Sequence, residues 1–285
     1  MNGGKKGESP ALVPENVHQG FLILVNAGHP LTGGFGQPEE AGRLVSLTPS
    51  AAGKAGAAGK PEPSSSPEIL LDAAAAKQLA AALAAIGAGE EIVPVSGFRS
   101  RREQEQIYRD SLRESGREFT EKFVALPGAS EHQTGLAIDL GENKPPIDFI
   151  CPAFPDEGIC QSFRQAAPDF GFIERYRAGK EGVTGIAREP WHFRYVGYPH
   201  SRIITDKGLA LEEYLEYLRW FSPDKPLVYP AGEGRGNYEI SYLAAPKKDE
   251  APALAASLTA AAGEAEIAVS GDNKAGFIIT IKRGI

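Results

Sequence analysis

The feature that most constrains this chain is a carboxylate in the middle of an apolar strand. Residues 136–140 read LAIDL, and their alternation puts Leu136, Ile138 and Leu140 on one face and Asp139 on the other. Burying a lone charge is costly unless it is paired with a counter-charge or bound to a metal. The segment therefore predicts a strand whose aspartate meets either an arginine or a metal ion.

Two histidines favour the metal. His132 precedes Asp139 by seven residues, and His192 ends the segment Glu-Pro-Trp-His at 189–192. Each histidine alone is explained more simply by a structural hydrogen bond. A catalytic zinc, however, usually takes three protein ligands and leaves a fourth position for water. A histidine, a carboxylate and a histidine would supply that ligand set.

Glu189 is the candidate general base. A metallopeptidase needs a base that lies close to the metal without binding it, and Glu189 stands three residues before His192. If the alternation of the strand expected at 191–196 continued back to residue 189, Glu189 would point to the face opposite His192. Pro190 is typical of the first residue of a strand, so we predict a bend there that turns Glu189 toward the metal.

Arg99 lies at a predicted strand-to-helix junction. Ile92, Val93 and Val95 indicate a short strand, and Ser100 with Glu103 forms a capping box that starts a helix. A guanidinium fixed at this junction could stabilise a carbonyl oxygen that becomes anionic in a transition state. The alternative is an ordinary surface arginine.

Other segments outline the rest of the fold. The apolar run at 19–25 indicates a strand or buried segment that ends in a turn, and the Ala/Gly/Pro/Ser-rich residues 50–67 indicate a flexible loop. Helices are predicted after the cap Asp72, around 160–167, and from Leu211 to near Phe221.

The composition changes after Pro223. Residues 267–282 are typical of a hairpin with a Gly-Asp-Asn turn, so 223–285 is interpreted as a small β-rich C-terminal appendage. The predicted organisation is a flexible N-terminus at 1–17, a catalytic domain at 18–222, and this appendage.

Composition limits the partners. The 285 residues carry a net charge of −7, which argues against nucleic acid or an anionic membrane as the main partner. The N-terminus has no apolar secretory segment and no run is long enough to span a membrane, so a cytoplasmic location is expected. Cys151 and Cys160 are interpreted as free thiols, with a disulfide between them as the alternative.

Three segments together resemble the VanX/VanY zinc D-Ala-D-Ala peptidases. They are SGFRS at 96–100, SEHQTGLAIDL at 130–140 and EPWHFRYVGYPH at 189–200. The resemblance extends from Val25 to near Phe221 and is greatest to the VanXY type, which combines D,D-dipeptidase and D,D-carboxypeptidase activities. It covers neither the insert near 50–60 nor the region beyond 223.

The resemblance implies an α+β fold of the Hedgehog/D,D-peptidase kind, with helices packed on a small antiparallel sheet that carries the zinc site. It implies these roles: zinc ligands His132, Asp139 and His192, base Glu189, transition-state stabiliser Arg99, and substrate-binding residues Ser130 and Gln104. Trp191 is a further candidate for substrate binding, although an aromatic residue at such a position is more often part of the core.

The function implied is that of a zinc metallopeptidase, a D-Ala-D-Ala carboxypeptidase/dipeptidase. Its substrates would be D-Ala-D-Ala or peptidoglycan precursor peptides, which links it to vancomycin resistance or cell-wall recycling. One alternative is an endopeptidase that cuts L-Ala-D-Glu links in the wall. Another is a non-catalytic binding module with a structural zinc, but such a module would tolerate loss of the base, so the presence of Glu189 argues against it.

Overall fold

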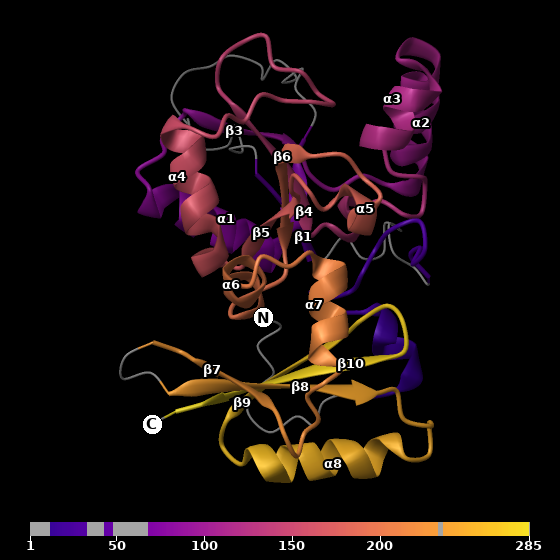
Figure 1. Cartoon of the computed structure of the whole chain (residues 1–285), viewed down its shortest axis with the longest axis vertical. Helices are drawn as coiled ribbons and strands as arrows, with labels where there is room; N and C mark the ends of the chain where they lie inside the picture. Colours follow the sequence, from indigo (N-terminus) through magenta and orange to yellow (C-terminus); the bar gives the residue numbers. More distant parts are fainter. Residues whose placement is uncertain (1–11, 33–42, 48–67, 233–235, 285) are drawn as a thin grey trace, which may run out of the picture.

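The computed structural model describes residues 12–32, 43–47, 68–232 and 236–284, which form two four-stranded sheets and one two-stranded sheet with helices around them (Figure 1). The loop predicted at 50–67 lies outside the described residues. The elements that precede residue 220 are η1 (Pro14–His18), β1 (Leu44–Ser46), β2 (Leu70–Asp72), α1 (Ala73–Ala85), β3 (Ile92–Ser96), α2 (Arg101–Glu114), α3 (Gly116–Phe123), η4 (Glu131–Thr134), β4 (Ala137–Glu142), α4 (Gly158–Ala166), η5 (Ala167–Phe170), β5 (Phe172–Tyr176), α5 (Glu181–Thr184), β6 (Glu189–Tyr195), α6 (His200–Asp206) and α7 (Leu211–Leu218).

The central sheet is antiparallel and has the strand order β3-β4-β6-β5. The predicted strands at 92–95, 136–140 and 191–196 are β3, β4 and β6. Helices α1 and α4 lie on one side of this sheet, and α2, α3 and α5 lie on the other (Figure 1). This arrangement confirms the predicted α+β fold of helices on a small antiparallel sheet.

The apolar face of β4 packs under α1 and α4. Ile138 and Leu140 share a buried cluster with Leu79 of α1 and Phe163 of α4. Each fully buried side chain of this size contributes roughly 1.5–3 kcal/mol. Because side chains alternate across a strand, burial of this face directs Asp139 to the opposite side of the sheet. The core therefore fixes the side on which the site is built.

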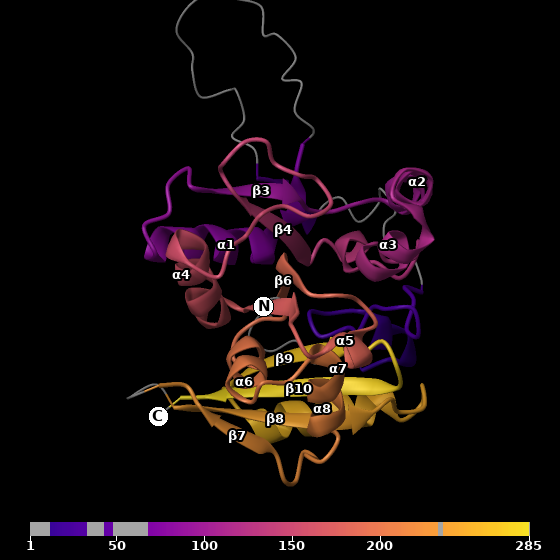
Figure 2. The same cartoon turned by 45° about the horizontal axis from the view of Figure 1, so that its top comes forward.

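Local capping signals set the helices near the site. Asp72 accepts a hydrogen bond from the backbone of Ala74 and begins α1. Ser100 and Glu103 form both hydrogen bonds of the predicted capping box and begin α2. Helix α3 lies beside α2, apart from α1 and α4 in both views (Figure 2). The capping box thus places the start of α2 directly after Arg99.

The C-terminal part contains a second antiparallel sheet with the order β7-β8-β10-β9. Its elements are β7 (Leu227–Pro230), β8 (Asn237–Ala244), α8 (Ala251–Ala262), β9 (Glu266–Gly271) and β10 (Gly276–Arg283). Strands β9 and β10 form the predicted hairpin, with Asn273 in its turn at φ 58°. Helix α8 was not predicted, and it covers the face of this sheet that points away from the central sheet (Figure 1).

The segment that precedes the central sheet packs on the C-terminal part. Leu12 and Val17 are buried with Leu258 of α8 and Phe277 of β10, although residues 12–17 fall in the predicted flexible N-terminus. Residues 22–25 are almost fully buried without forming a strand, and a turn follows at 26–29. This confirms the buried-segment interpretation of the apolar run.

A second buried apolar cluster packs α6 and α7 against the C-terminal sheet. Ile203 of α6 and Leu215 of α7 pack in one cluster with Ile240 of β8 and Ile278 of β10. We call this cluster the shared core. Ser222 therefore marks a change in secondary structure, while the apolar packing continues across it. The division of the chain into domains at that residue stays a prediction.

Both cysteines are free thiols, with Cys151 half-buried and Cys160 buried. Burial raises the pKa of each thiol to about 11. Among the described residues, no helix has the length and apolar composition needed to cross a membrane.

Candidate active site

The site is centred on Asp139, on the inner strand β4. Asp139 pairs with Ser96 of β3 on one side and with His192 of β6 on the other. Directly opposite residues of an antiparallel pair have neighbouring side chains on one face of the sheet. Strand pairing alone therefore brings the predicted carboxylate and the second predicted histidine together.

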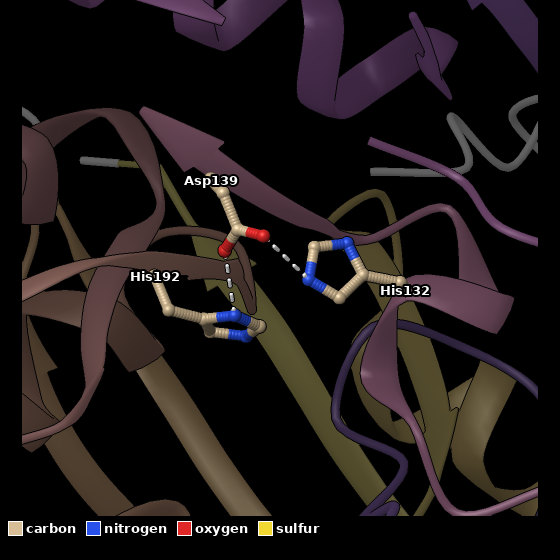
Figure 3. A group of neighbouring side chains, drawn as sticks. All are labelled: His132, Asp139 and His192. Carbon is tan, nitrogen blue, oxygen red and sulfur yellow. Dashed lines mark hydrogen bonds and ion pairs between the residues drawn. The ribbon is translucent and has the colours of Figure 1, made fainter. Parts of the chain in front are cut away.

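The two histidines flank the carboxylate, one at each oxygen (Figure 3). His192 Nδ1 lies 3.0 Å from Asp139 Oδ1, and His132 Nε2 lies 3.1 Å from Asp139 Oδ2. The two imidazole rings are 4.9 Å apart and nearly perpendicular. All three residues are buried, with at most 4% of each exposed.

The orientation of His132 follows from a backbone contact. His132 Nδ1 lies 2.7 Å from the carbonyl oxygen of Gly97, and because a carbonyl only accepts, Nδ1 must donate. Burial, and then the charge of Arg99, lower the pKa of His132 to about 4. The ring is thus neutral, and the lone pair of Nε2 faces Asp139.

The three side chains have the character of a metal site. One ligand atom from each lies within 4.8 Å of the others. Burial opposes the charge of Asp139, but His132 and His192 outweigh it and hold the pKa of the carboxyl below its ordinary value. Two imidazole nitrogens and a carboxylate oxygen are a donor set that zinc accepts, so the residues present fit a catalytic zinc.

Glu189 lies beside this group without belonging to it. Its Oε2 is 3.7 Å from His192 Nδ1. Burial raises the pKa of Glu189 to about 8, outweighing the opposite effect of His192. A carboxyl group that holds a proton near neutral pH is suited to give and take protons.

A β-bulge gives Glu189 its orientation. Glu189 pairs with Tyr176 and Phe193 pairs with Glu174, so three residues of β6 face one residue of β5 between the two pairs. Extra residues in one strand re-aim its side chains. The predicted bend at Pro190 takes this form.

Arg99 lines the pocket that also contains His132, Asp139, Glu189 and His192, and it is not an ordinary surface arginine. Its side chain is 12% exposed, and Nη2 donates to Asp139 Oδ2 at 2.9 Å. Nε donates to Ser96 at 2.8 Å. The guanidinium is thus held by the same strand pair that positions Asp139.

The remaining predicted residues line the same pocket. Ser130, Gln104 and Trp191 all contribute to its wall. Gln104 is fully buried, and its amide donates to the carbonyl of Ala125 at 2.9 Å. Trp191 is 8% exposed and also packs in the core of the central sheet, so it fits both of its interpretations.

Two residues of the site were not predicted. Tyr176 lines the pocket, with its ring 4.9 Å from that of His192. Glu131 lies on the other side of His192, with Oε2 3.5 Å from Nε2. A buried tyrosine carries no local signal in the sequence. Glu131 could have been noticed as a carboxylate directly beside a predicted ligand.

The other three histidines lie outside the site. His18 contacts Asn273, and His29 contacts Asn26. His200 is buried between Tyr214 and Thr280, at 2.8 and 3.0 Å, and burial lowers its pKa to about 3.

Comparison with known proteins places this geometry in a family. The family model of VanY, D-alanyl-D-alanine carboxypeptidase, matches residues 68–198. The bifunctional D-Ala-D-Ala dipeptidase and D-Ala-D-Ala carboxypeptidase VanXYC of Enterococcus gallinarum is 46% identical over 157 residues, which cover 55% of this chain and 83% of VanXYC. The chain belongs to the VanY family. It is therefore a member of a family of D-Ala-D-Ala peptidases, which are hydrolases.

Solved structures agree with the assignment to the VanY family. The vancomycin resistance D,D-dipeptidase VanXYg, in complex with a D-Ala-D-Ala phosphinate analogue, superposes with a TM-score of 0.78 at 41% identity, covering 94% of this chain and 96% of VanXYg. A mutant of the D,D-pentapeptidase VanY from a VanB-type resistance cassette, in complex with Zn(II), gives a TM-score of 0.51 at 28% identity, covering 68% of this chain and 98% of that one. The first match includes the C-terminal part of the chain.

Proposed function

We propose that the chain is a zinc-dependent D-Ala-D-Ala carboxypeptidase/dipeptidase. The observation that carries the proposal is the buried group of His132, Asp139 and His192 beside a carboxyl group, Glu189, that does not belong to it. A base next to an open metal site is the requirement of metal-assisted hydrolysis. Membership of the VanY family supports the choice of a D-Ala-D-Ala peptide as substrate.

The zinc would be held by His132, Asp139 and His192. Bound there, it would polarise the scissile carbonyl and lower the pKa of a water molecule toward neutrality. The contribution of the chain is orientation. His132 is fixed by the carbonyl of Gly97, and Asp139 is fixed between the two rings.

Glu189 would move the proton. Its carboxylate form accepts a proton from the attacking water, and the resulting acid delivers that proton to the amine of the leaving D-alanine. Burial favours the protonated acid, and His192 favours the carboxylate. The side chain is therefore suited to both halves of the transfer.

Arg99 would stabilise the oxygen of the scissile carbonyl as negative charge develops on it. The guanidinium already lies at the pocket, held through Nε by Ser96. Donors that are fixed before the reaction are worth more than donors that must be ordered during it. Ser130 and Gln104, which line the same pocket, would contact the peptide.

The substrates that we propose are D-Ala-D-Ala itself and peptidoglycan precursors ending in D-Ala-D-Ala. VanXYC is a bifunctional D-Ala-D-Ala dipeptidase and D-Ala-D-Ala carboxypeptidase, and VanXYg is a vancomycin resistance D,D-dipeptidase. Removal of terminal D-alanine would remove the target of vancomycin, which links the proposed activity to glycopeptide resistance.

Glu189→Gln tests the proposal. The substitution keeps the size of the side chain but cannot accept the proton. We expect near-normal zinc stoichiometry and a kcat reduced by about 10²-fold or more, the lower end for general acid–base catalysis. Zinc content and release of D-alanine from D-Ala-D-Ala and from a pentapeptide precursor should be measured on the same sample.

Glu181→Gln on α5 is the matched control, because Glu181 is exposed and close in sequence. It should retain full zinc and full turnover. Retained turnover in Glu189→Gln would remove Glu189 from the mechanism, and loss of zinc from that variant would make Glu189 a ligand. A wild-type protein that binds zinc but releases no D-alanine from either substrate would overturn the proposed function.

A further inference from the structure

Behind His192 lies a buried cluster of charges that the proposed mechanism does not use. We call it the four-charge cluster, and it consists of Glu131, Arg175, Arg194 and Glu212. The first three side chains are fully buried, and that of Glu212 is 12% exposed. Its two arginines balance its two glutamates. Burying even a balanced set of charges costs desolvation free energy, so stability alone does not explain why this cluster is present.

Glu131 is the member that faces the site. Its Oε1 lies 2.8 Å from Arg175 Nε and 2.9 Å from Arg194 Nη1. Arg175 is held in turn by both oxygens of Glu212, and Arg194 by the carbonyls of Phe21 and Ile23. The position of Oε1 is thus fixed from two sides.

The second oxygen of Glu131 is left without a hydrogen bond. Oε2 is buried, and so is His192 Nε2, which also has no hydrogen-bond partner among the described residues. The two atoms lie 3.5 Å apart. Buried polar atoms are rarely left unpaired, and these two complement each other as acceptor and donor.

The opposite edge of the His192 ring faces the proposed metal ligands. Nδ1 lies 3.0 Å from Asp139. A neutral imidazole carries one proton, so a proton held on Nε2 leaves the lone pair on Nδ1. In metal sites, the second nitrogen of a ligating histidine usually donates to a carboxylate or carbonyl, which fixes the tautomer.

We propose that Glu131 is a positioning residue that accepts the Nε2 proton of His192 and so presents Nδ1 to the metal. The inference rests on the proposed zinc site. The two ligand histidines would then use opposite nitrogens, because His132 donates from Nδ1 to Gly97 and presents Nε2. Glu131 and His132 are neighbours on η4, so one short turn supplies a ligand and the support of another ligand.

The tautomers can be read directly in the wild-type protein. With ¹⁵N-labelled histidine and bound zinc, the proposal predicts a proton on Nε2 of His192 and on Nδ1 of His132. The chain has five histidines, which keeps the spectrum assignable. Bound zinc with a proton on Nδ1 of His192 would overturn the inference and leave the proposed function standing, whereas absence of zinc binding would overturn both.

Glu131→Gln tests how much Glu131 contributes to zinc affinity. Loss of a partner behind a metal ligand typically costs about 10–100-fold in metal affinity. We expect a zinc affinity lowered by about that factor, measured by competition with a chelator. Glu212→Gln is the matched control, since it removes a carboxylate from the same cluster without facing His192. It should change zinc affinity by less than about threefold, well below the usual cost of losing such a partner.

A purely structural role for Glu131 predicts a different pattern. As a counter-ion for the arginines alone, Glu131 would give the two variants equal zinc affinities and an unchanged His192 tautomer, and that result would refute the proposal. Should Glu131→Gln fail to fold, the tautomer measurement on the wild-type protein decides the question.

Discussion

Gly97 offers a sharp test of how the backbone supports the site. A Cβ atom at this position would lie 2.2 Å from the carbonyl oxygen of Leu70 and 3.0 Å from Ile69 Cγ2. The first contact is with backbone and cannot be relieved by a side-chain rotation. In Gly97→Ala, the backbone at residue 97 and that of Leu70 must therefore move apart by about 1 Å to restore an ordinary van der Waals distance.

The movement has two costs. The carbonyl of Leu70 accepts a 2.7 Å hydrogen bond from the backbone of Phe98, and its loss costs about 1 kcal/mol. Overpacking of a tight contact costs about 1–3 kcal/mol more. We therefore expect Gly97→Ala to lower the free energy of unfolding by about 2–4 kcal/mol. Because the carbonyl of Gly97 also orients His132, zinc affinity should fall by about 10–100-fold.

Urea denaturation followed by circular dichroism measures the stability, and chelator competition in the absence of urea measures the zinc affinity. Gly182→Ala in α5 is the matched control, because nothing lies within 4 Å of a Cβ there. It should be neutral or slightly stabilising. If Gly97→Ala keeps both its stability and its zinc affinity, the contacts of Gly97 do not support His132.

Three further outcomes can be checked. Arg99→Ala should lower kcat by about 10²–10³ with zinc retained, and a normal kcat with a raised KM in steady-state kinetics would instead make Arg99 a ground-state binder. Deletion after Ser222 should expose the shared core and give aggregates in size-exclusion chromatography, while a monodisperse product would show that the catalytic part folds alone. The pKa of His200 is lowered to about 3, so below pH 6.5 the unfolded state binds a proton that the folded state does not. The free energy of unfolding should therefore fall by up to about 1.4 kcal/mol per pH unit from about pH 6 toward pH 3. In His200→Gln, this contribution of one bound proton to the pH dependence should be absent. Equal pH dependences of the two proteins in urea titrations would contradict the prediction.

Most of the fold near the site could be predicted from local signals in the sequence. The alternation around Asp139, the cap at Asp72 and the box of Ser100 with Glu103 each depend on residues a few positions apart. Such signals act through the backbone of one element, so they can be recognised without knowledge of the tertiary structure.

The appendage shows where local signals were insufficient. Helix α8 was not predicted, because its residues 251–262 are mostly alanine and lack a polar face that would reveal a helical period. The hairpin predicted at 267–282, with its Gly-Asp-Asn turn, dominated the interpretation of 223–285 as β-rich.

The parts of the site that could not be predicted depend on distant residues. Glu131 meets Arg175 and Arg194 only because β5 and β6 are neighbours in the sheet. The bulge in β6 was indicated by Pro190, but its pairing with β5 was not. The ligands and the base were predicted because the resemblance to a known family supplied their association, which spacing alone did not.

The contacts of the segment 12–30 have a consequence for synthesis of the chain. His18 contacts Asn273, which is 255 residues away, and Asn273 also donates to the carbonyl of Leu24. Folding begins during translation and proceeds from the N-terminal side, but this segment has to wait for the β9–β10 turn to leave the ribosome. Contacts of such long sequence separation form slowly because the loop-closure entropy must be overcome first. We therefore expect the central sheet to form while the apolar residues 22–25 are still exposed on the nascent chain.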